Sequence, residues 1–350
     1  MDSINHSVCT NVTINDGYCY GLPVCGYCYD FNKTLEPWDA YELYNLMIIR
    51  IFLPVIGLFG LFGNGVSAFI YSRKSMRSSM NIYLCALAIS DTIIILTAFF
   101  LFFIENLRYK SLLLSEIFAI LTPLAFPLGL TAQSLSVFLT VTSAIDCYIL
   151  IYSNPNFKRR FCSTSSSLKI VAIIFMLAML YNSPHMLEIS VITCWNVIYA
   201  EKSIDVCPSD LRQSQLYLTV YYAWLYTAIM AVGPVLILIV LNSLIIIGLR
   251  NALSVSGESD IITLVLVVCL FITCNVLPLT VNFLELIVGY VNSYLIDLSN
   301  LMVVLNSSCN FLIYFAFGSR FRKTLKEYAE MIFFRGSASQ TFPNSVPEKA

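Results

Sequence analysis

Four polar side chains interrupt the long apolar segments of this sequence and carry the ligand types that a small cation prefers. Asp91 lies in the middle of one apolar segment, and Ser136, Asn306 and Asn310 lie at comparable depth in two others. One carboxylate with hydroxyl and amide oxygens suits a small hard cation. The same four residues also suit a hydrogen-bonded cluster that holds no ion. The residue types alone leave both interpretations open.

A second carboxylate, Asp146, lies near the end of an apolar segment and is followed directly by Cys147. Because a buried carboxylate without a partner is costly, we expect Asp146 to reach loop water or a basic residue such as Arg159 or Arg160. The sequence holds only two histidines and no glycine-rich phosphate loop. These features argue against an enzyme.

These side chains must be positioned by helices that cross a membrane. Of the 350 residues, 58% are hydrophobic and 12% are charged, whereas soluble domains carry about 25% charged residues. A helix needs about 20 mainly apolar residues to cross the hydrocarbon core. Seven segments meet this requirement: residues 46–71, 80–104, 115–148, 168–190, 215–248, 261–288 and 294–317. The sequence therefore predicts an all-α membrane protein with a seven-transmembrane helix bundle over residues 46–317.

Lysine and arginine orient this bundle. With the N-terminus outside, the inner loops and tail hold fourteen of these residues and the outer segments hold six, which is the expected bias. Asn-x-Ser/Thr sites at Asn5, Asn11 and Asn32 agree, because glycans are added on the outer side. We expect residues 1–45 to form a glycosylated, disulfide-bearing extracellular segment without a cleavable signal peptide.

The C-terminal part differs from the bundle in composition. Residues 318–334 place basic and apolar residues at helical spacing. This pattern predicts a short amphipathic eighth helix on the inner membrane surface. Residues 335–350 are rich in serine and proline and predict a disordered cytoplasmic tail.

Half of the twelve cysteines fall in segments that are expected to face the oxidising exterior. They are Cys9, Cys19, Cys25, Cys28, Cys194 and Cys207. An even number favours up to three disulfides. The spacing of Cys25 and Cys28 would also suit half of a zinc site, but no histidine other than His6 is near them in the sequence, so we expect disulfides.

Acidic residues dominate the expected outer side, where fourteen acidic and six basic residues give a net charge of −8. Such a mouth attracts cationic ligands. Glu105, Glu285 and Asp297 lie at outer helix ends, where a pocket would open, and Gln133 lies deeper. Five aromatic residues crowd the outer half of the fifth segment: Tyr217, Tyr221, Tyr222, Trp224 and Tyr226. These rings suit either a ligand or an interfacial aromatic belt.

Several motifs resemble those of rhodopsin-like (class A) G-protein-coupled receptors. They are Leu87-Ala-Ile-Ser-Asp91, Asp146-Cys147-Tyr148 and Asn310-Phe-Leu-Ile-Tyr314, the last two with the family's arginine and proline replaced. Within that family, four segments resemble invertebrate FMRFamide-like neuropeptide receptors: residues 76–81, 209–226, 274–285 and 305–314.

The resemblance implies a multi-pass plasma-membrane receptor that binds an extracellular amidated peptide and signals through a heterotrimeric G protein. Its partners would be the peptide, the G protein and the bilayer, without nucleic acid, and its one inorganic ligand would be a sodium ion. The expected peptide contacts are Glu105, Gln133, Tyr221, Trp224, Asn282, Glu285, Asp297 and Asn300. The sodium-pocket positions are Asp91, Ser136, Asn306 and Asn310. The G-protein face and switch fall on Asp146, Cys147, Tyr148 and Tyr314.

Some positions depart from the family's pattern. Cys147 replaces the arginine that holds the inactive state and contacts the G protein. Thr122 lies where a cysteine usually bonds the second outer loop, so Cys194 and Cys207 would pair with each other or with N-terminal cysteines. A decoy, atypical or chemosensory receptor with weak coupling is therefore an alternative. A transporter or channel subunit would need a chain of membrane-embedded charges, which the sequence does not contain.

Overall fold

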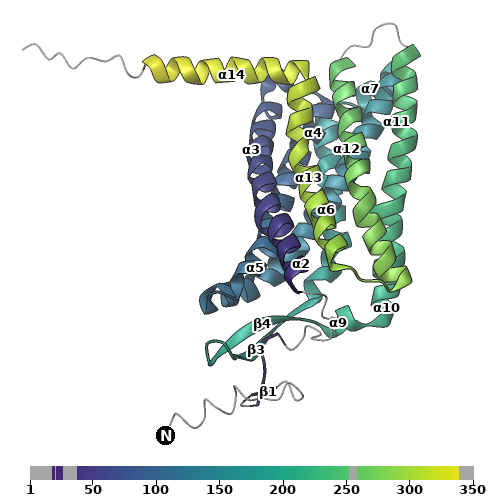
Figure 1. Ribbon diagram of the computed structural model, residues 1–350. Coiled ribbons are helices and arrows are strands. Elements are labelled where there is room, and N and C mark those ends of the chain that lie inside the picture. Colours follow the sequence, from purple (N-terminus) through teal and green to yellow (C-terminus); the bar gives the residue numbers. More distant parts are fainter. Residues whose placement is uncertain (1–17, 20, 27–37, 252–257, 339–350) are drawn as a thin grey trace, which may run out of the picture.

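Seven long helices run side by side as one bundle in the computed structural model, which describes residues 18–19, 21–26, 38–251 and 258–338 (Figure 1). Each helix is long and apolar enough to cross a membrane. The spans are Ala40–Tyr71, Ser79–Arg108, Leu112–Tyr152, Thr164–Leu187, Gln215–Arg250, Ile261–Phe283 and Ser293–Phe317. The predicted seven-span fold is confirmed.

Most spans consist of more than one helical element. Spans one to three comprise α2 (Trp38–Asn45), η1 (Leu46–Phe52), α3 (Leu53–Tyr71), α4 (Ser79–Ala98), η3 (Phe99–Ile104), α5 (Glu105–Arg108) and α6 (Leu112–Tyr152). Spans four to seven comprise α8 (Thr164–Asn182), η4 (Ser183–Leu187), α10 (Gln215–Tyr217), η5 (Leu218–Val232), α11 (Gly233–Asn251), α12 (Glu258–Phe283), η6 (Leu284–Val288) and α13 (Ser293–Phe317).

A two-stranded β-hairpin covers one end of the bundle, which we call the outer end in line with the predicted orientation. Its strands are β3 (Ile189–Asn196) and β4 (Glu201–Pro208), paired antiparallel. The short strands β1 (Tyr18–Cys19) and β2 (Leu22–Pro23) lie beyond it (Figure 1). The predicted fourth segment, residues 168–190, ends too late, because the chain leaves the helix after Leu187 and enters β3.

The outer ends of four spans are wound as π-helix: η1, η3, η5 and η6. π-Helical turns are rare and occur often at functional sites. η6 ends at Gly289, whose φ of 72° lies in the left-handed region that glycine adopts without strain. The irregular helices are thus gathered at the end where a ligand is expected.

Spans one and seven approach each other closely through small residues. A Cβ on Gly60 would overlap Ser308 Oγ, and one on Gly63 would lie 2.7 Å from Phe311 Cβ. Small residues at helix contacts allow backbones to come together within a bilayer. This contact holds α13 in place beside α3, and α13 carries two of the four predicted cation ligands.

At the inner end, α14 (Ser319–Ala338) starts at the end of α13 and extends sideways past α3, away from the bundle and nearly perpendicular to the spans (Figure 1). Phe321 on α14 is 1% exposed and contacts the rings of Tyr71 and Tyr314. The helix α7 (Pro155–Phe161) lies in the loop between spans three and four. The predicted contact of α14 with the membrane surface stays a prediction.

Candidate functional site

Asp91 is fully buried in the middle of the bundle and receives hydrogen bonds from two other spans. Ser136 Oγ donates to Oδ1 at 3.2 Å, and Asn310 Nδ2 donates to Oδ2 at 2.8 Å. Asn306 is also buried, four residues before Asn310 and one turn away on α13. The structure therefore brings Asp91, Ser136 and Asn310 into direct contact and sets Asn306 beside them.

Several buried oxygen atoms near this cluster lack a hydrogen-bond partner within the described ranges. They are Asn64 Oδ1, Asn306 Oδ1, Asn310 Oδ1 and Ser308 Oγ. The Asn64 amide donates to Ser307 O at 2.8 Å, which fixes Asn64 against α13. Because a buried polar atom without a partner is costly, these oxygens are suited to water or to a cation.

Asp146 at the inner end forms a hydrogen-bond network with serine side chains. Ser79 Oγ donates to Asp146 Oδ1 at 2.8 Å and lies 2.6 Å from Ser167 Oγ. The expectation that Asp146 reaches Arg159 or Arg160 is wrong, since both arginines are exposed and the ion pairs among described residues do not include Asp146. The Ser79 hydroxyl at the start of α4 thus binds one oxygen of this carboxylate in place of a charged group, while Asp146 Oδ2 has no hydrogen-bond partner among the described residues.

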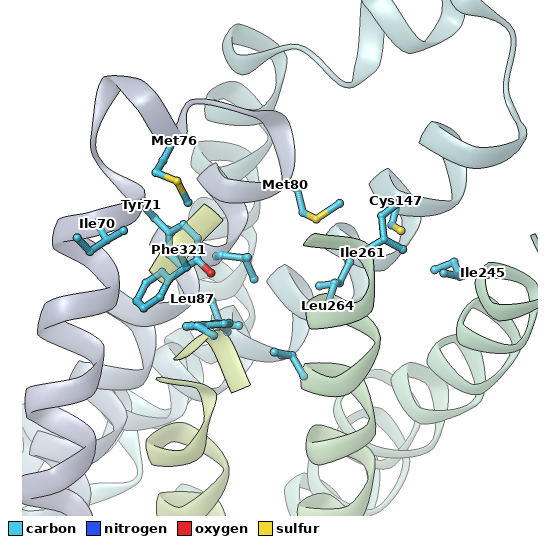
Figure 2. Packing of buried hydrophobic residues seen from close by; sticks show 13 residues of the cluster. Ile70, Tyr71, Met76, Met80, Leu87, Cys147, Ile245, Ile261, Leu264 and Phe321 are labelled. Atoms are coloured by element: carbon cyan, nitrogen blue, oxygen red, sulfur yellow. The ribbon is translucent and has the colours of Figure 1, made fainter. Parts of the chain in front are cut away.

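Cys147 is 0% exposed and belongs to an apolar cluster that joins six of the seven spans and α14 at the inner end (Figure 2). Its neighbours in the cluster include Met80 from α4, Ile245 from α11 and Leu264 from α12. Tyr314 from α13 is also 0% exposed in the cluster. Contacts between apolar side chains thus close the inner end at the position where the family carries an arginine.

Tyr148, also predicted at this face, is half-buried, and its ring contacts the Tyr152 ring in a tilted arrangement, with centroids 4.9 Å apart. Tyr152 OH in turn donates to Leu244 O at 2.8 Å. These contacts join the inner ends of spans three and five.

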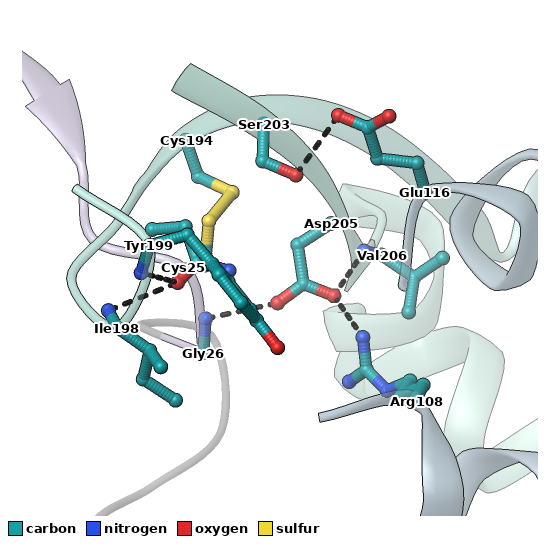
Figure 3. The surroundings of a disulfide bond; sticks show 11 residues. Cys25, Gly26, Arg108, Glu116, Cys194, Ile198, Tyr199, Ser203, Asp205 and Val206 are labelled. Carbon is teal, nitrogen blue, oxygen red and sulfur yellow. Dashed lines mark hydrogen bonds and ion pairs between the residues drawn. A yellow bond between two sulfur atoms is a disulfide. The ribbon is translucent and has the colours of Figure 1, made fainter. Parts of the chain in front are cut away.

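A disulfide joins Cys25 to Cys194 with an S–S distance of 2.03 Å and ties the N-terminal segment to β3 (Figure 3). It excludes the zinc alternative at Cys25. Cys207 is also disulfide-bonded, and since Cys194 bonds to Cys25, these two do not pair with each other. The side chains of Cys9, Cys19 and Cys28 lie outside the described residues, as do the glycosylation sites Asn5, Asn11 and Asn32.

A buried ion pair lies next to this disulfide (Figure 3). Arg108 Nη1 donates to Asp205 Oδ1 at 2.7 Å, and the two side chains are 1% and 6% exposed. Gly26 N donates to Asp205 Oδ2 at 2.9 Å. Thr122, at the position where rhodopsin-like receptors usually carry a cysteine bonded to the second outer loop, is buried and donates to Phe118 O at 2.6 Å. Asp205 therefore joins the end of span two, the hairpin and the N-terminal segment.

A second buried carboxylate, Glu188, lies where span four meets the hairpin. His185 Nδ1 lies 2.6 Å from Glu188 Oε1, and Tyr217 OH donates to the same oxygen at 2.5 Å. Tyr222 OH donates to Oε2 at 2.7 Å, and Arg212 Nη1 donates to Oε2 at 3.2 Å. Burial would raise the pKa of Glu188, but the hydrogen bonds from His185 and Tyr217 bring it below its usual value.

Glu188 and Asp205 count among the fourteen acidic residues of the expected outer side, and Arg108 among the six basic ones, but nothing in the sequence singled out any of the three. The partners of Glu188 did carry a signal, because Arg212, Tyr217 and Tyr222 all lie in residues 209–226, one of the segments that resemble FMRFamide-like receptors. The sequence did not indicate that this segment folds back onto the end of span four.

Two of the predicted peptide contacts are held by neighbouring helices. Asp297 is 9% exposed and receives hydrogen bonds from Tyr41 OH at 3.0 Å and Asn45 Nδ2 at 2.9 Å, so it ties span seven to span one. Tyr221 is buried and donates to Tyr181 O at 2.6 Å. The remaining side chains are half-buried or exposed: Glu105, Gln133, Asn282 and Asn300 in the first class, and Glu285 in the second.

Trp224 corrects the aromatic prediction. It is 71% exposed and lies two residues from both Tyr222 and Tyr226, which places it on the opposite side of its helix. Trp224 therefore faces away from the bundle, as expected for an aromatic belt, and we remove it from the candidate contacts.

The described residues contain no group of three or more His, Cys, Asp or Glu side chains that could hold a metal ion.

Comparisons with known proteins agree with this architecture. A family model described as 7 transmembrane receptor (rhodopsin family) matches residues 63–314. The chain is 55% identical over 361 residues to the "Probable G-protein coupled receptor frpr-1" of Caenorhabditis elegans, covering 99% of this chain and 96% of that relative.

Two further relatives are named for FMRFamide. The chain is 32% identical over 335 residues to the "FMRFamide receptor" of Drosophila melanogaster, covering 90% of this chain and 57% of that relative. It is 30% identical over 295 residues to the "FMRFamide peptide receptor frpr-18" of Caenorhabditis elegans, covering 77% and 66%. The chain thus spans little more than half the length of the Drosophila relative.

Proposed function

The chain belongs to the rhodopsin family of seven-transmembrane receptors, and from this premise we propose that it is a plasma-membrane receptor for an extracellular, amidated, FMRFamide-like neuropeptide. The N-terminus faces outside, and signalling passes through a heterotrimeric G protein. The observation that carries the proposal is the similarity over 90% of this chain to a relative named as an FMRFamide receptor.

The charge of the outer segments supports a cationic peptide. These segments carry a net charge of −8, and a mouth with an excess of one sign of charge raises the local concentration of ligands of opposite sign. Among the predicted contacts, Glu105, Glu285 and Asn282 lie on the outer parts of spans two and six. We retain these residues with Gln133 and Asn300 as candidate peptide contacts, and we assign Asp297 to the contact between spans one and seven.

A sodium ion at Asp91 is part of the proposal. The carboxylate, the Ser136 hydroxyl and the unpartnered oxygens of Asn306 and Asn310 supply the oxygen ligands that a hard cation prefers. In a two-state bundle, an ion that binds one packing arrangement better shifts the equilibrium toward it. Asp91 would then couple ion binding to the arrangement of the helices.

Signal transmission would require the apolar cluster around Cys147 to separate at the inner end. Cys147 is buried among apolar side chains and bears no permanent charge. This observation favours a second candidate function, a receptor that binds its ligand but couples weakly to the G protein. The two candidates share ligand binding and differ in activation.

Binding is therefore the first test. Fluorescent FMRFamide is added to cells that display the chain at their surface, with non-fluorescent amidated peptide and its free acid as competitors. We expect saturable binding that the amidated peptide displaces and the free acid displaces poorly. Absence of displaceable binding across a panel of FMRFamide-like peptides, with surface display verified, would contradict the peptide assignment.

A further inference from the structure

The groups around Glu188 differ in how firmly they are held. Glu188 and His185 are 1% and 2% exposed and lie at the end of span four. Tyr217 and Tyr222 belong to span five, and both donate to the carboxylate. Three of the four donors thus come from the ends of packed spans, which gives the carboxylate a fixed position and orientation.

Arg212 is held less firmly than these neighbours. It lies on α9 (Asp210–Gln213), a single turn in the segment between β4 and span five. Its side chain is 36% exposed, and its bond to Glu188 is the longest of the set at 3.2 Å. Arg212 is therefore the one member that can leave without moving a span.

The position of the Arg212 side chain has the features of a guanidinium site. Its Cζ lies 4.2 Å from the centroid of the Tyr222 ring, while Nη1 donates to Glu188. A planar guanidinium can stack on an aromatic face and bind a carboxylate at the same time, whereas a lysine ammonium is a compact point charge. The chemistry of this position selects arginine.

We propose that Glu188 and Tyr222 form a guanidinium-binding subsite, that Arg212 occupies it in the ligand-free receptor, and that an arginine of the ligand takes its place. The inference rests on the proposed function, since it assigns one anchor to an arginine-bearing peptide. In a purely structural role, Arg212 would only fasten the segment after β4 to span four, and an external guanidinium would not replace it.

The test is chemical rescue with argininamide on purified receptor. Arg212→Ala leaves the buried carboxylate without its cation. Argininamide should raise the thermal unfolding temperature of this variant, and citrullinamide, which has nearly the same shape but an uncharged urea side chain, should not. The variant should bind argininamide about tenfold or more tightly than the wild type, because no resident arginine competes for the site.

Two control variants accompany this test. Glu188→Gln with Arg212→Ala should lose the rescue, and Arg160→Ala, on the exposed inner helix α7, should respond like the wild type. Equal stabilisation by both amides, equal affinity in wild type and Arg212→Ala, or rescue that survives Glu188→Gln would overturn the proposal.

The peptide assignment is judged separately on the same proteins. If argininamide rescues Arg212→Ala but FMRFamide does not bind the wild type, the peptide assignment fails and the subsite stands. A second peptide, FMRFamide with citrulline in place of arginine, completes the comparison. If FMRFamide binds the wild type, and Glu188→Gln weakens the binding of FMRFamide no more than the binding of this citrulline peptide, the subsite fails and the peptide assignment stands.

Discussion

Arg108 and Asp205 form a buried ion pair, 2.7 Å across, between the outer end of span two and the β4 strand. In the resembling family a disulfide usually fastens the second outer loop to span three, and here Thr122 takes the position of its cysteine. The fastening is instead divided between this ion pair and the Cys25–Cys194 disulfide, which leads to the N-terminal segment. The outer hairpin is thus anchored to the bundle without the usual covalent bond.

Replacing Arg108 by alanine should destabilise the receptor by about 3–5 kcal/mol, because Asp205 would stay buried without its cation. Thermal unfolding of purified receptor measures this change. The double variant Arg108→Met with Asp205→Leu should be closer to wild type than either single alanine variant. A double variant whose loss equals the sum of the two single losses would show that the pair does not couple.

Sodium should raise the unfolding temperature of the wild type relative to an equal concentration of a large organic cation. The physical reason is that an ion that binds the folded state stabilises it by mass action. Asp91→Asn removes the charged ligand and should abolish the difference. Asp146→Asn, which changes a carboxylate at the inner end, should retain it. A sodium effect of equal size in wild type and Asp91→Asn would contradict an ion at Asp91.

Replacing Cys147 by arginine should raise G-protein activation. Cys147 is 0% exposed in the apolar cluster of the inner end, so a larger charged side chain does not fit the closed packing and should favour a form in which it reaches water. Nucleotide exchange on a co-expressed G protein measures the change. Cys147→Ser, of similar size, should stay near wild type. No gain with arginine, at matched surface level, would argue against Cys147 as the limit on coupling.

The Cys162 thiol in the inner loop should react slowly with alkylating reagents. Burial and the neighbouring Asp146 carboxylate raise the pKa of Cys162 to about 12. Because only the thiolate reacts, and a raised pKa leaves less of it at a given pH, the alkylation rate should keep rising about tenfold per pH unit beyond pH 9. Asp146→Asn should speed the reaction at pH 8. A rate that levels off near pH 9 in the wild type would contradict the raised pKa.

The bundle and its central cluster could be predicted because both follow from position along single helices. Hydropathy locates each span, and distance from the helix end sets the depth of Asp91 and Asn310. The outer groups could not be predicted in this way. Glu188 meets Arg212 and Tyr222 only because the chain folds back after β4, and Asp205 meets Arg108 only through the register of the hairpin.

The sequence of the hairpin has the residue pattern of two strands, but the apolar run of the fourth segment masked the first of them. Residues 189–193 are rich in β-branched side chains and residues 203–207 alternate polar and apolar side chains, as strands do. The first of these runs continues the apolar fourth segment, so hydropathy alone extended the helix to residue 190. Cys147 was identified as a departure, but its burial among side chains from several spans depends on tertiary packing.

The most direct measurement of the central claim is G-protein activation in transfected cells with verified surface display. FMRFamide, its free acid and a panel of related amidated peptides are applied to wild type, to Cys147→Arg and to untransfected cells. We expect dose-dependent activation by at least one amidated peptide and little response to the free acid, with a larger response in Cys147→Arg. Silence of both the wild type and Cys147→Arg across the panel would contradict a peptide receptor that signals through a G protein.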